Sequence, residues 1–179
     1  MGKQICVISS SPRGGSNSEA LCDEFIRGAR ESGHLAEKIV LSEKTIGYCR
    51  GCEVCNETHA CVQRDDMADI LDRMVAADVI VLATPVYFYT PCAQMKTLID
   101  RTAPRYTEIR DKDFYYIATM ADPDEGAMDR TFEGLRGFTT ELLPGAREKG
   151  VLRGCGVQHA GDIRHTETMR QAFDMGRRV

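Results

Sequence analysis

Short apolar runs alternate along the chain with stretches whose apolar residues recur at helical spacing. The short runs predict buried strands, and the longer periodic stretches predict helices. The predicted strands are Ile5–Ile8, Ala36–Leu41, Val79–Thr84, Phe114–Thr119 and Val151–Gly156. The predicted helices are Ser18–Ser32, Asp65–Ala77, Pro91–Ala103, Met128–Leu142 and about Thr166–Gly176. Five alternations of strand and helix predict an α/β fold with a parallel sheet, helices on both faces and ligands at the carboxyl ends of the strands.

Length, composition and charge restrict the class of protein. The chain has 179 residues, 42% hydrophobic and 28% charged, with no visible repeat or linker, so we expect one domain over residues 1–179. A net charge of −4 gives no support to a nucleic-acid or anionic-membrane partner. The N-terminus lacks the apolar core of a secretion signal, and no apolar run approaches the roughly 18 residues that span a bilayer. We therefore predict a cytoplasmic protein, whose thiols stay reduced.

The segment between the first predicted strand and its helix is rich in small hydroxyl residues. Residues 9–18 read SSSPRGGSNS, and we call them the serine loop. Because a helix start has unpaired N–H groups and partial positive charge, this loop predicts an anion site. It lacks the lysine of a P-loop, the G-x-G-x-x-G of a dinucleotide fold and the loop cysteine of a low-molecular-weight tyrosine phosphatase. It suits a terminal phosphate monoester such as that of FMN, and an ordinary turn with an N-cap serine stays open as the alternative.

Four of the eight cysteines lie close together, in the pattern Cys49-x-x-Cys52-x-x-Cys55-x5-Cys61. Successive Cys-x-x-Cys turns bring sulfurs toward one metal or one face of a cluster. The compact spacing is typical of iron–sulfur ligands rather than of zinc ribbons, which pair two such turns across a longer gap. The pattern predicts a 4Fe–4S cluster in a cysteine loop at about residues 47–64. A zinc site, a thiol–disulfide pair and four thiols without a ligand stay open as alternatives.

A run of aromatic residues follows the third predicted strand. We expect Pro85 to end the ladder of that strand, and Tyr87, Phe88 and Tyr89 follow it. This turn should lie at the same sheet edge as the serine loop, where a flat heteroaromatic ring would find stacking partners. Taken alone, three adjacent aromatic residues are more typical of a hydrophobic plug.

In this order, the features resemble the iron–sulfur flavoproteins, which belong to the NADPH-dependent FMN reductase group of flavodoxin-like proteins. The resemblance rests on the serine loop, the four cysteines, Asp65-Asp66-Met67, Pro85-Val86-Tyr87 and Lys96…Asp100-Arg101, and covers about residues 4–105. It implies a flavodoxin-like three-layer sandwich with a five-stranded parallel sheet in the order 2-1-3-4-5. It also implies non-covalently bound FMN, a cluster beside the flavin, and a homodimer or homotetramer.

The resemblance also implies roles for individual residues. The FMN phosphate would be bound by Ser9, Ser11, Arg13, Ser16, Asn17 and Ser18. The ribityl chain and ring would be held by Pro85, Val86, Tyr87 and Phe88, with Met120, Ala121 and Asp122 beside them. The cluster ligands would be Cys49, Cys52, Cys55 and Cys61. Lys96, Asp100 and Arg101 would brace the fold or a dimer rather than take part in chemistry.

The residues after the fourth predicted strand depart from the family pattern. Relatives often have glycines there, whereas this chain reads MADPDE over residues 120–125. Three carboxylates at this turn would repel the phosphates of NADPH and any anionic partner. NAD(P)H is therefore a candidate electron donor whose use the sequence leaves in doubt.

These observations predict an FMN-dependent redox protein in which no side chain is assigned as catalytic. Electrons would pass between FMN, a 4Fe–4S cluster and a small-molecule or protein partner that the sequence does not name. A cluster-free NAD(P)H-dependent FMN or quinone reductase is one alternative, and a non-catalytic electron carrier is a second. A zinc-stabilised binding protein is a third.

Overall fold

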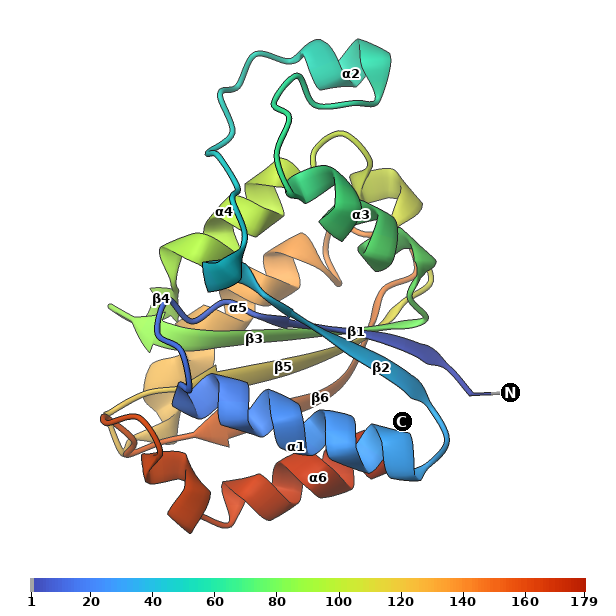
Figure 1. The fold of residues 1–179 in the computed structure, drawn as a ribbon. Coiled ribbons are helices and arrows are strands. Elements are labelled where there is room, and N and C mark those ends of the chain that lie inside the picture. The colour runs from blue at the N-terminus through green and yellow to red at the C-terminus, as the bar shows by residue number, and fades with distance from the viewer. Residues whose placement is uncertain (1) are drawn as a thin grey trace.

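A mostly parallel sheet lies between two layers of helices in the computed structural model, which describes residues 2–179 (Figure 1). The strands are β1 (Gln4–Ser9), β2 (Leu35–Val40), β3 (Val79–Tyr87), β4 (Thr90–Pro91), β5 (Asp113–Thr119) and β6 (Arg147–Gly154). The helices are α1 (Asn17–Glu31), α2 (Val54–Thr58), α3 (Met67–Ala76), α4 (Ala93–Arg101), α5 (Asp129–Phe138) and α6 (Thr168–Arg177). Short 3₁₀ turns cover Leu41–Glu43 (η1), Tyr106–Glu108 (η2), Glu125–Met128 (η3) and Asp162–His165 (η4).

The sheet confirms the predicted strand order and adds one strand. Five parallel strands lie in the order β2-β1-β3-β5-β6, which is the order 2-1-3-4-5 when β4 is left out of the numbering. The sheet has six strands rather than the five that we expected, because β4 pairs antiparallel with the end of β3. The extra strand is two residues long and turns back directly from β3, so it leaves the parallel topology unchanged.

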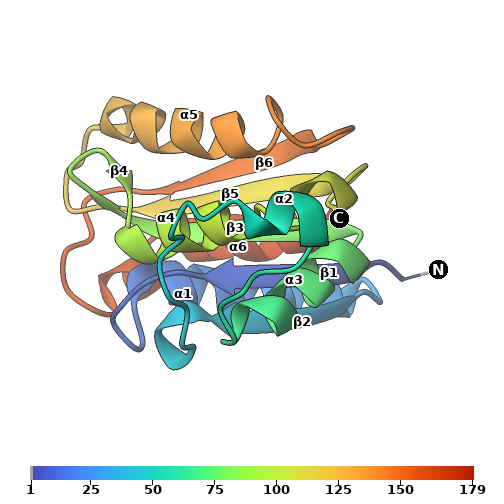
Figure 2. The same ribbon diagram turned by 90° about the horizontal axis from the view of Figure 1, so that it is seen from above.

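The two helical layers cover opposite faces of the sheet. Helices α1 and α6 pack on one face, and α3, α4 and α5 pack on the other (Figures 1 and 2). Alternate residues of β1 divide between the two cores: Ile5 and Val7 face the α1 side, whereas Cys6 and Ile8 face the α3 side. This double burial explains why the strands read as continuous apolar runs rather than as alternating patterns.

Helix α1 shows how local sequence sets the limits of an element. The helix begins after Ser16, whose Oγ accepts a hydrogen bond from Glu19 N at 3.2 Å. It ends at Ser32 and Gly33, and the glycine adopts a φ of +83°, which residues with a side chain rarely adopt. No helix of residues 2–179 is both long enough and apolar enough to cross a membrane.

The prediction that Pro85 ends the third strand is wrong. Strand β3 continues to Tyr87, and Pro85 is in register with Thr119 of β5. Strand β1 has already ended, since its last residue Ser9 lies beside Ala83. The pairing of β3 with β1 therefore ends before Pro85, and β4 pairs with Val86 and Tyr87 only, so the missing N–H of Pro85 leaves no ladder bond unmade.

Two further boundaries differ from the prediction at the C-terminal side of the sheet. Strand β6 begins at Arg147 rather than Val151, because its first residues are polar and half-exposed at the sheet edge. Glu148 there forms an ion pair with Arg136 of α5 at 2.7 Å. Helix α5 ends at Phe138 rather than Leu142, and the Thr139 hydroxyl donates back to Leu135 O at 3.0 Å. Helix α2 was not predicted.

Helices α1 and α6 pack so closely that glycine is required on both sides of their contact. A Cβ atom at Gly28 would lie 2.0 Å from Phe173 O, and a Cβ atom at Gly176 would lie 2.0 Å from Phe25 O. The guanidinium of Arg27 lies 3.9 Å from the centre of the Phe173 ring. This pair of glycines therefore fixes the helix layer on which the serine loop depends, since α1 begins at that loop.

Replacing Gly28 by Ala should destabilise the fold by about 3 kcal/mol, because the two helices must separate to admit a methyl group. Urea unfolding followed by circular dichroism measures the free energy of unfolding. Gly137→Ala in α5 is the matched control, because nothing lies within 4 Å of its Cβ position, and it should stabilise the fold by up to about 1 kcal/mol. Equal stability of the two variants would contradict the close contact between α1 and α6.

The Asp113 carboxylate joins three chain segments at the amino ends of the strands. It accepts hydrogen bonds from Arg147 Nε at 2.8 Å and from Lys3 Nζ at 3.3 Å. Partial burial opposes ionisation, but the hydrogen bonds from these two cations outweigh it and hold the pKa of Asp113 below its ordinary value.

These ion pairs should stabilise the protein at neutral pH and cease to do so in acid. Because the folded-state pKa lies below the unfolded value of about 3.9, the contribution is complete above that pH and is lost as the pH falls through the folded-state pKa. We expect Asp113→Asn to lower the free energy of unfolding by about 1 kcal/mol at pH 7, and its difference from wild type to shrink below pH 4. A difference that stays constant from pH 7 to pH 3 would show that the charge is not responsible.

Candidate functional site

The carboxyl ends of β1, β3 and β5 lie side by side and carry the three turns predicted to bind a flavin. Ser9 is in register with Ala83, and Pro85 is in register with Thr119. Because parallel strands end at a common edge, the serine loop, the aromatic turn and the Met120–Asp122 turn follow one another along it.

The serines of the serine loop are buried although their side chains are polar. Ser9, Ser11, Ser16 and Ser18 are each at most 2% exposed. Ser16 is the N-cap of α1, and its Oγ lies 3.3 Å from Ser18 Oγ. The N-cap alternative is therefore present at Ser16, and Ser11 Oγ accepts from Arg13 N at 3.2 Å, but neither contact involves the buried hydroxyl of Ser9.

The Ser9 hydroxyl has no hydrogen-bond partner within residues 2–179 although it is fully buried. An unpaired buried hydroxyl costs about 1–3 kcal/mol, and such groups are rare in folded proteins. Ser9 ends β1 and lies at the start of the loop that leads to the positive end of the α1 dipole. The serine loop therefore fits an anionic group that accepts a hydrogen bond, such as the terminal phosphate of FMN.

Two residues predicted to bind the phosphate also hold the loop in place. Asn17 Nδ2 donates to His159 O at 2.9 Å, and Asn17 Oδ1 accepts from Gly161 N at 3.0 Å. Arg13 is exposed, and its Nη1 donates to Gln158 O at 3.4 Å. Both side chains thus tie the serine loop to the segment before α6, and phosphate binding by them stays a prediction.

The segment that Asn17 contacts was not assigned to the site from the sequence. It is held by Asp162, whose Oδ2 accepts hydrogen bonds from His159 N at 2.7 Å and from Gln158 N at 3.0 Å. These backbone hydrogen bonds hold the pKa of Asp162 below its ordinary value. The sequence signal for this turn was Gly161, which has a φ of +94° and follows the last predicted strand.

The aromatic turn is a tight hairpin between β3 and β4. Its two central residues have positive φ angles, 50° at Phe88 and 65° at Tyr89, as in a type I′ turn. Residues with aromatic side chains rarely adopt a positive φ angle. Thr131 of α5 holds the turn, since its Oγ1 donates to Tyr89 O at 3.0 Å. Phe88 is 97% exposed, so the run is not the hydrophobic plug that we weighed as an alternative.

A buried polar network joins the serine loop to the aromatic turn. Ser10 Oγ donates to Ala83 O at 2.8 Å, and Cys92 Sγ donates to Ser10 O at 3.2 Å. Cys92 N donates to Thr84 Oγ1 at 3.1 Å. This network was not predicted, because the predicted helix Pro91–Ala103 included Cys92, whereas α4 begins after it and Cys92 is the N-cap.

The third turn is supported by the chain that follows β6. Met120 N donates to Gly154 O at 2.9 Å, and Gly156 N donates to Asp122 O at 3.0 Å. The Met120 side chain is buried in the core on the α3 side of the sheet, and its backbone C=O accepts from Val157 N at 2.9 Å. Ligand contact by Met120 therefore stays a prediction.

Negative charge surrounds this third turn. Asp122, Asp124 and Glu125 are all exposed. Asp122 Oδ1 accepts from Asp124 N at 2.9 Å, and Asp124 Oδ1 accepts from Gly126 N at 3.0 Å. The carboxylates thus shape the turn and place acidic groups in solvent beside it, which supports the expected repulsion of phosphate groups there.

The four clustered cysteines line one cavity of about 170 Å³ within the cysteine loop. The loop bends at Glu53 and His59, which have φ angles of 60° and 53° at the two ends of α2. Among residues 2–179, no three His, Cys, Asp or Glu side chains surround a single metal position. A cubane cluster binds each thiolate at a different iron, so thiols spread around one cavity fit it better than they fit a single zinc ion.

Helix α4 connects this loop to the sheet edge. Its N-cap, Cys92, belongs to the network of the serine loop, and its last residue, Arg101, donates to Gly47 O at 2.6 Å at the base of the cysteine loop. The loop projects beyond the layer formed by α3 and α4 (Figure 1). A helix of nine residues is about 14 Å long, which sets the scale of the separation between the two sites.

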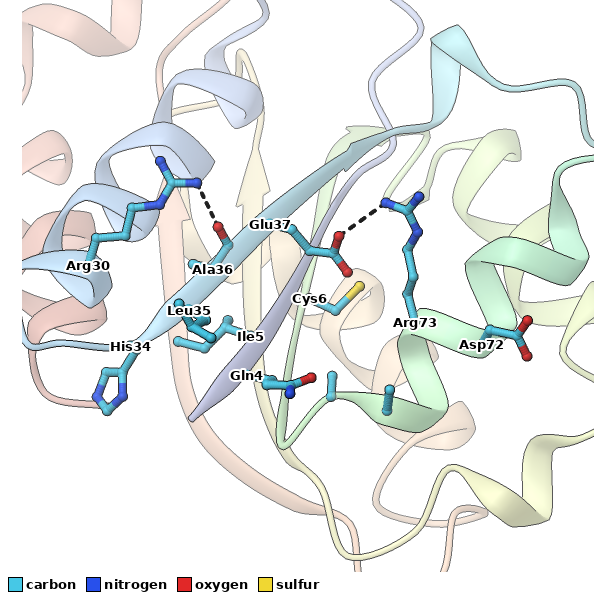
Figure 3. Close-up of a pocket in the computed structure, with 12 residues that line it drawn as sticks. Gln4, Ile5, Cys6, Arg30, His34, Leu35, Ala36, Glu37, Asp72 and Arg73 are labelled. Atoms are coloured by element: carbon cyan, nitrogen blue, oxygen red, sulfur yellow. Dashed lines mark hydrogen bonds and ion pairs between the residues drawn. The ribbon is translucent and has the colours of Figure 1, made fainter. Parts of the chain in front are cut away.

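A cavity larger than that of the cysteine loop lies away from both sites. This cavity of about 710 Å³ is lined by the amino ends of β1 and β2 and by α3 (Figure 3). Its cations are already engaged, since Arg30 Nη2 donates to Ala36 O at 2.7 Å and Arg73 Nη1 donates to Glu37 Oε2 at 3.0 Å. Ligands of parallel α/β sheets bind at the carboxyl ends of the strands, so this cavity is not the candidate site.

Comparison with known proteins gives a family. The sequence model of the NADPH-dependent FMN reductase family matches residues 4–133. An iron–sulfur flavoprotein of Methanocaldococcus jannaschii is 35% identical over 137 residues, which are 75% of this chain and 70% of that protein. An iron–sulfur flavoprotein of Archaeoglobus fulgidus is 41% identical over 97 residues, 54% of this chain and 44% of that protein. The chain therefore spans less than half the length of the Archaeoglobus relative.

Solved structures show the same fold at low identity. An NAD(P)H:quinone oxidoreductase from Methanothermobacter marburgensis has a TM-score of 0.76 at 15% identity and covers 99% of this chain and 96% of its own. An FMN-dependent NADH-azoreductase from Bacillus anthracis, solved with FMN, has a TM-score of 0.71 at 15% identity and covers 99% of both chains. The sheet order and these likenesses establish the flavodoxin-like fold. With a family match that extends over residues 4–133, the chain belongs to the NADPH-dependent FMN reductase family.

Proposed function

We propose that the chain is an FMN-dependent oxidoreductase with a 4Fe–4S cluster in its cysteine loop. Electrons would pass between the two groups and a small-molecule or protein partner. The observation that carries the proposal is the placement of α4, which begins at the network of the serine loop and ends at the base of the cysteine loop.

The serine loop and the aromatic turn would hold the FMN. The unpaired hydroxyl of Ser9 and the start of α1 would bind the phosphate, together with Ser11, Ser16 and Ser18. The segment from Pro85 to Phe88 would flank the ribityl chain and the ring, and the backbone of Met120–Asp122 would lie at the ring edge. Bound FMN supplies two-electron and one-electron transfer, and these residues position it and exclude water.

The cysteine loop would hold the cluster through Cys49, Cys52, Cys55 and Cys61. Their common cavity and the cluster-type spacing support this ligand set. A bound cluster exchanges single electrons, which suits a neighbour that can accept electrons in pairs. Relatives of the chain carry the name iron–sulfur flavoprotein, and the four thiols would be the cluster ligands in this chain.

The negative charge at the third turn bears on which electron donor the protein can use. NAD(P)H stays a candidate donor, but its phosphates would meet the exposed Asp122, Asp124 and Glu125.

A cluster-free NAD(P)H-dependent FMN or quinone reductase is the second candidate function, and the family match favours it.

We also propose a homo-oligomer in a reducing, cytoplasmic compartment. Phe88 is 97% exposed and Tyr48 is 78% exposed, and a second copy of the chain would shield such side chains from water. All eight cysteines are free, which suits a compartment in which thiols stay reduced.

Anaerobic purification should give a yellow protein with about four irons and four sulfides per chain, if each chain holds one cubane cluster. Cys49→Ser should lose most of the iron and sulfide and keep its FMN, because the cysteine loop lies outside the flavin edge. Metal and sulfide analysis, with the flavin absorption spectrum, measures both.

Cys22→Ala is the matched control, because Cys22 is a buried thiol of α1 and should keep full iron content. Wild-type protein with FMN but without iron would favour the cluster-free reductase. Protein with zinc and no flavin would support the binding-protein alternative, and protein with neither group would reject the proposal.

Ser9→Ala should weaken FMN binding by about tenfold to a hundredfold, because a hydrogen bond to a charged group contributes about 1.5–3 kcal/mol. Riboflavin affinity should not change, since riboflavin has no phosphate. The same substitution should stabilise the ligand-free protein by about 1 kcal/mol, because it removes an unpaired buried hydroxyl. Calorimetric titration and urea unfolding of the ligand-free chain measure the two effects.

Ser10→Ala is a control whose effect on the stability of the ligand-free chain should be opposite to that of Ser9→Ala. It should destabilise the ligand-free chain, because the Ser10 hydroxyl donates to Ala83 O at 2.8 Å. If Ser9→Ala left the affinities for FMN and riboflavin equally changed, the phosphate would not lie at the serine loop.

A further inference from the structure

The base of the cysteine loop is closed by contacts between its two ends. Gly47 N donates to Asp65 Oδ2 at 2.9 Å. Gln63 Nε2 donates to Tyr48 O at 2.9 Å. These contacts join the segment that enters the loop to the segment that leaves it. We call Gly47, Tyr48, Gln63, Asp65 and Arg101 the neck of the loop.

The centre of the neck is a buried pair of charges. Arg101 and Asp65 form a bidentate ion pair: Arg101 Nη1 lies 2.7 Å from Asp65 Oδ2, and Arg101 Nη2 lies 2.9 Å from Asp65 Oδ1. The side chain of Arg101 is 2% exposed and that of Asp65 is 10% exposed. The hydrogen bonds from Arg101 hold the pKa of Asp65 below its ordinary value. A guanidinium is suited to this contact because it presents several donors in one rigid plane.

The same guanidinium also binds the backbone of the loop. Arg101 Nη1 donates to Gly47 O at 2.6 Å. Gly47 therefore has both its N–H and its C=O engaged by the ion pair. A Cβ atom on Gly47 would lie 2.6 Å from Gln63 Oε1, so the flexible Gln63 side chain would have to move and would give up its hydrogen bond to Tyr48 O.

The neck lies next to the fourth cysteine of the loop. Cys61 and Arg101 line one cavity of about 310 Å³, together with His59 and Met67. Arg101 Nε is buried and has no hydrogen-bond partner among the described residues. The neck therefore sets the position of Cys61 through the short segment Val62–Arg64, and it sets the position of Cys49 through Gly47 and Tyr48.

A buried ion pair is weak evidence for stability as such, because desolvation offsets much of the attraction. Apolar residues of similar size would pack at the same place without that cost. What apolar residues cannot do is bind the Gly47 backbone and fix the direction in which the loop leaves the helix layer. The specific contacts thus point to a role in conformation rather than in net stability.

We propose that Asp65 and Arg101 are positioning residues for the cysteine ligands. The pair closes the neck in the metal-free chain and presents the four thiols around one cavity before a cluster binds. The part about the metal-free loop stands by itself, and the part about the cluster rests on the proposed function.

Limited trypsin digestion of the metal-free chain tests the closed neck. The reporter site is Arg50, which is exposed in the loop and is left unchanged by both substitutions. Asp65→Asn and Arg101→Lys should each speed cleavage after Arg50 at least about tenfold, because lysine cannot bind both carboxylate oxygens and Gly47 O. Asp100→Asn is the matched control on α4: it removes an exposed ion pair with Lys96 and should leave the cleavage rate unchanged.

A readout of the sheet edge separates positioning from general destabilisation. FMN content and the far-ultraviolet circular dichroism of both variants should match wild type, while the loop becomes open to trypsin. If a variant does not fold, Gly47→Ala tests the same neck with the ion pair intact, and it should also speed cleavage after Arg50. Unchanged cleavage after Arg50 in the folded variants would overturn the proposal.

Cluster assembly tests the second part. With ferrous iron and sulfide added anaerobically, Asp65→Asn and Arg101→Lys should incorporate iron at least about fivefold more slowly than wild type and Asp100→Asn. Equal rates in all four proteins would overturn a role for the neck in cluster binding. A wild-type chain that takes up no iron would instead reject the proposed function and leave the trypsin result to decide the conformation of the loop.

Discussion

The parallel pairing of β1, β3 and β5 is the constraint on which the rest of the structure depends. It places Ser9 beside Ala83 and Pro85 beside Thr119, so that the turns after these strands meet at one edge. Burial of the sheet on both faces by apolar side chains holds this register, since a slip by one residue would move each side chain to the other face. The serine loop inherits its position from β1 and its partial positive charge from α1.

Helix α4 extends this edge to a second site. It starts at Cys92, whose thiol and N–H bind the ends of β1 and β3, and it ends at Arg101, which binds the base of the cysteine loop. A loop that projects from a helix layer would otherwise be free to move, because few apolar side chains anchor it. Arg101 and Asp65 bind Gly47 at the base of the loop, and a fixed loop direction is what the proposed pair of redox groups would require.

The sequence predicted the five parallel strands because they are continuous apolar runs, and it predicted five helices because their apolar residues recur at helical spacing. Where the prediction failed, tertiary context overrode a local rule. Pro85 did not end β3, because the neighbouring strand had already ended. The polar start of β6 was missed, because an edge strand needs only partial burial.

The three turns predicted to bind a flavin lie at one sheet edge and the four cysteines line one cavity, but the binding roles of these residues stay predictions. The partners of the site residues could not be read from the chain. Asn17 contacts His159, 142 residues away in sequence, and no local pattern reports such a contact. Ser10 and Cys92 were missed because their role depends on Ala83 and Thr84 of another strand. The unpaired hydroxyl of Ser9 could be found only once every neighbour was in place.

The central claim is that the three turns at the carboxyl ends of β1, β3 and β5 bind FMN. Hydrogen–deuterium exchange, measured by mass spectrometry with and without FMN, tests it most directly. If FMN binds at the three turns, its addition should slow amide exchange in residues 9–20, 85–90 and 119–123. Exchange at the amino ends of β1 and β2 should not change. Protection confined to the amino-end cavity lined by Gln4, Leu35 and Arg73, with none at the three turns, would contradict it.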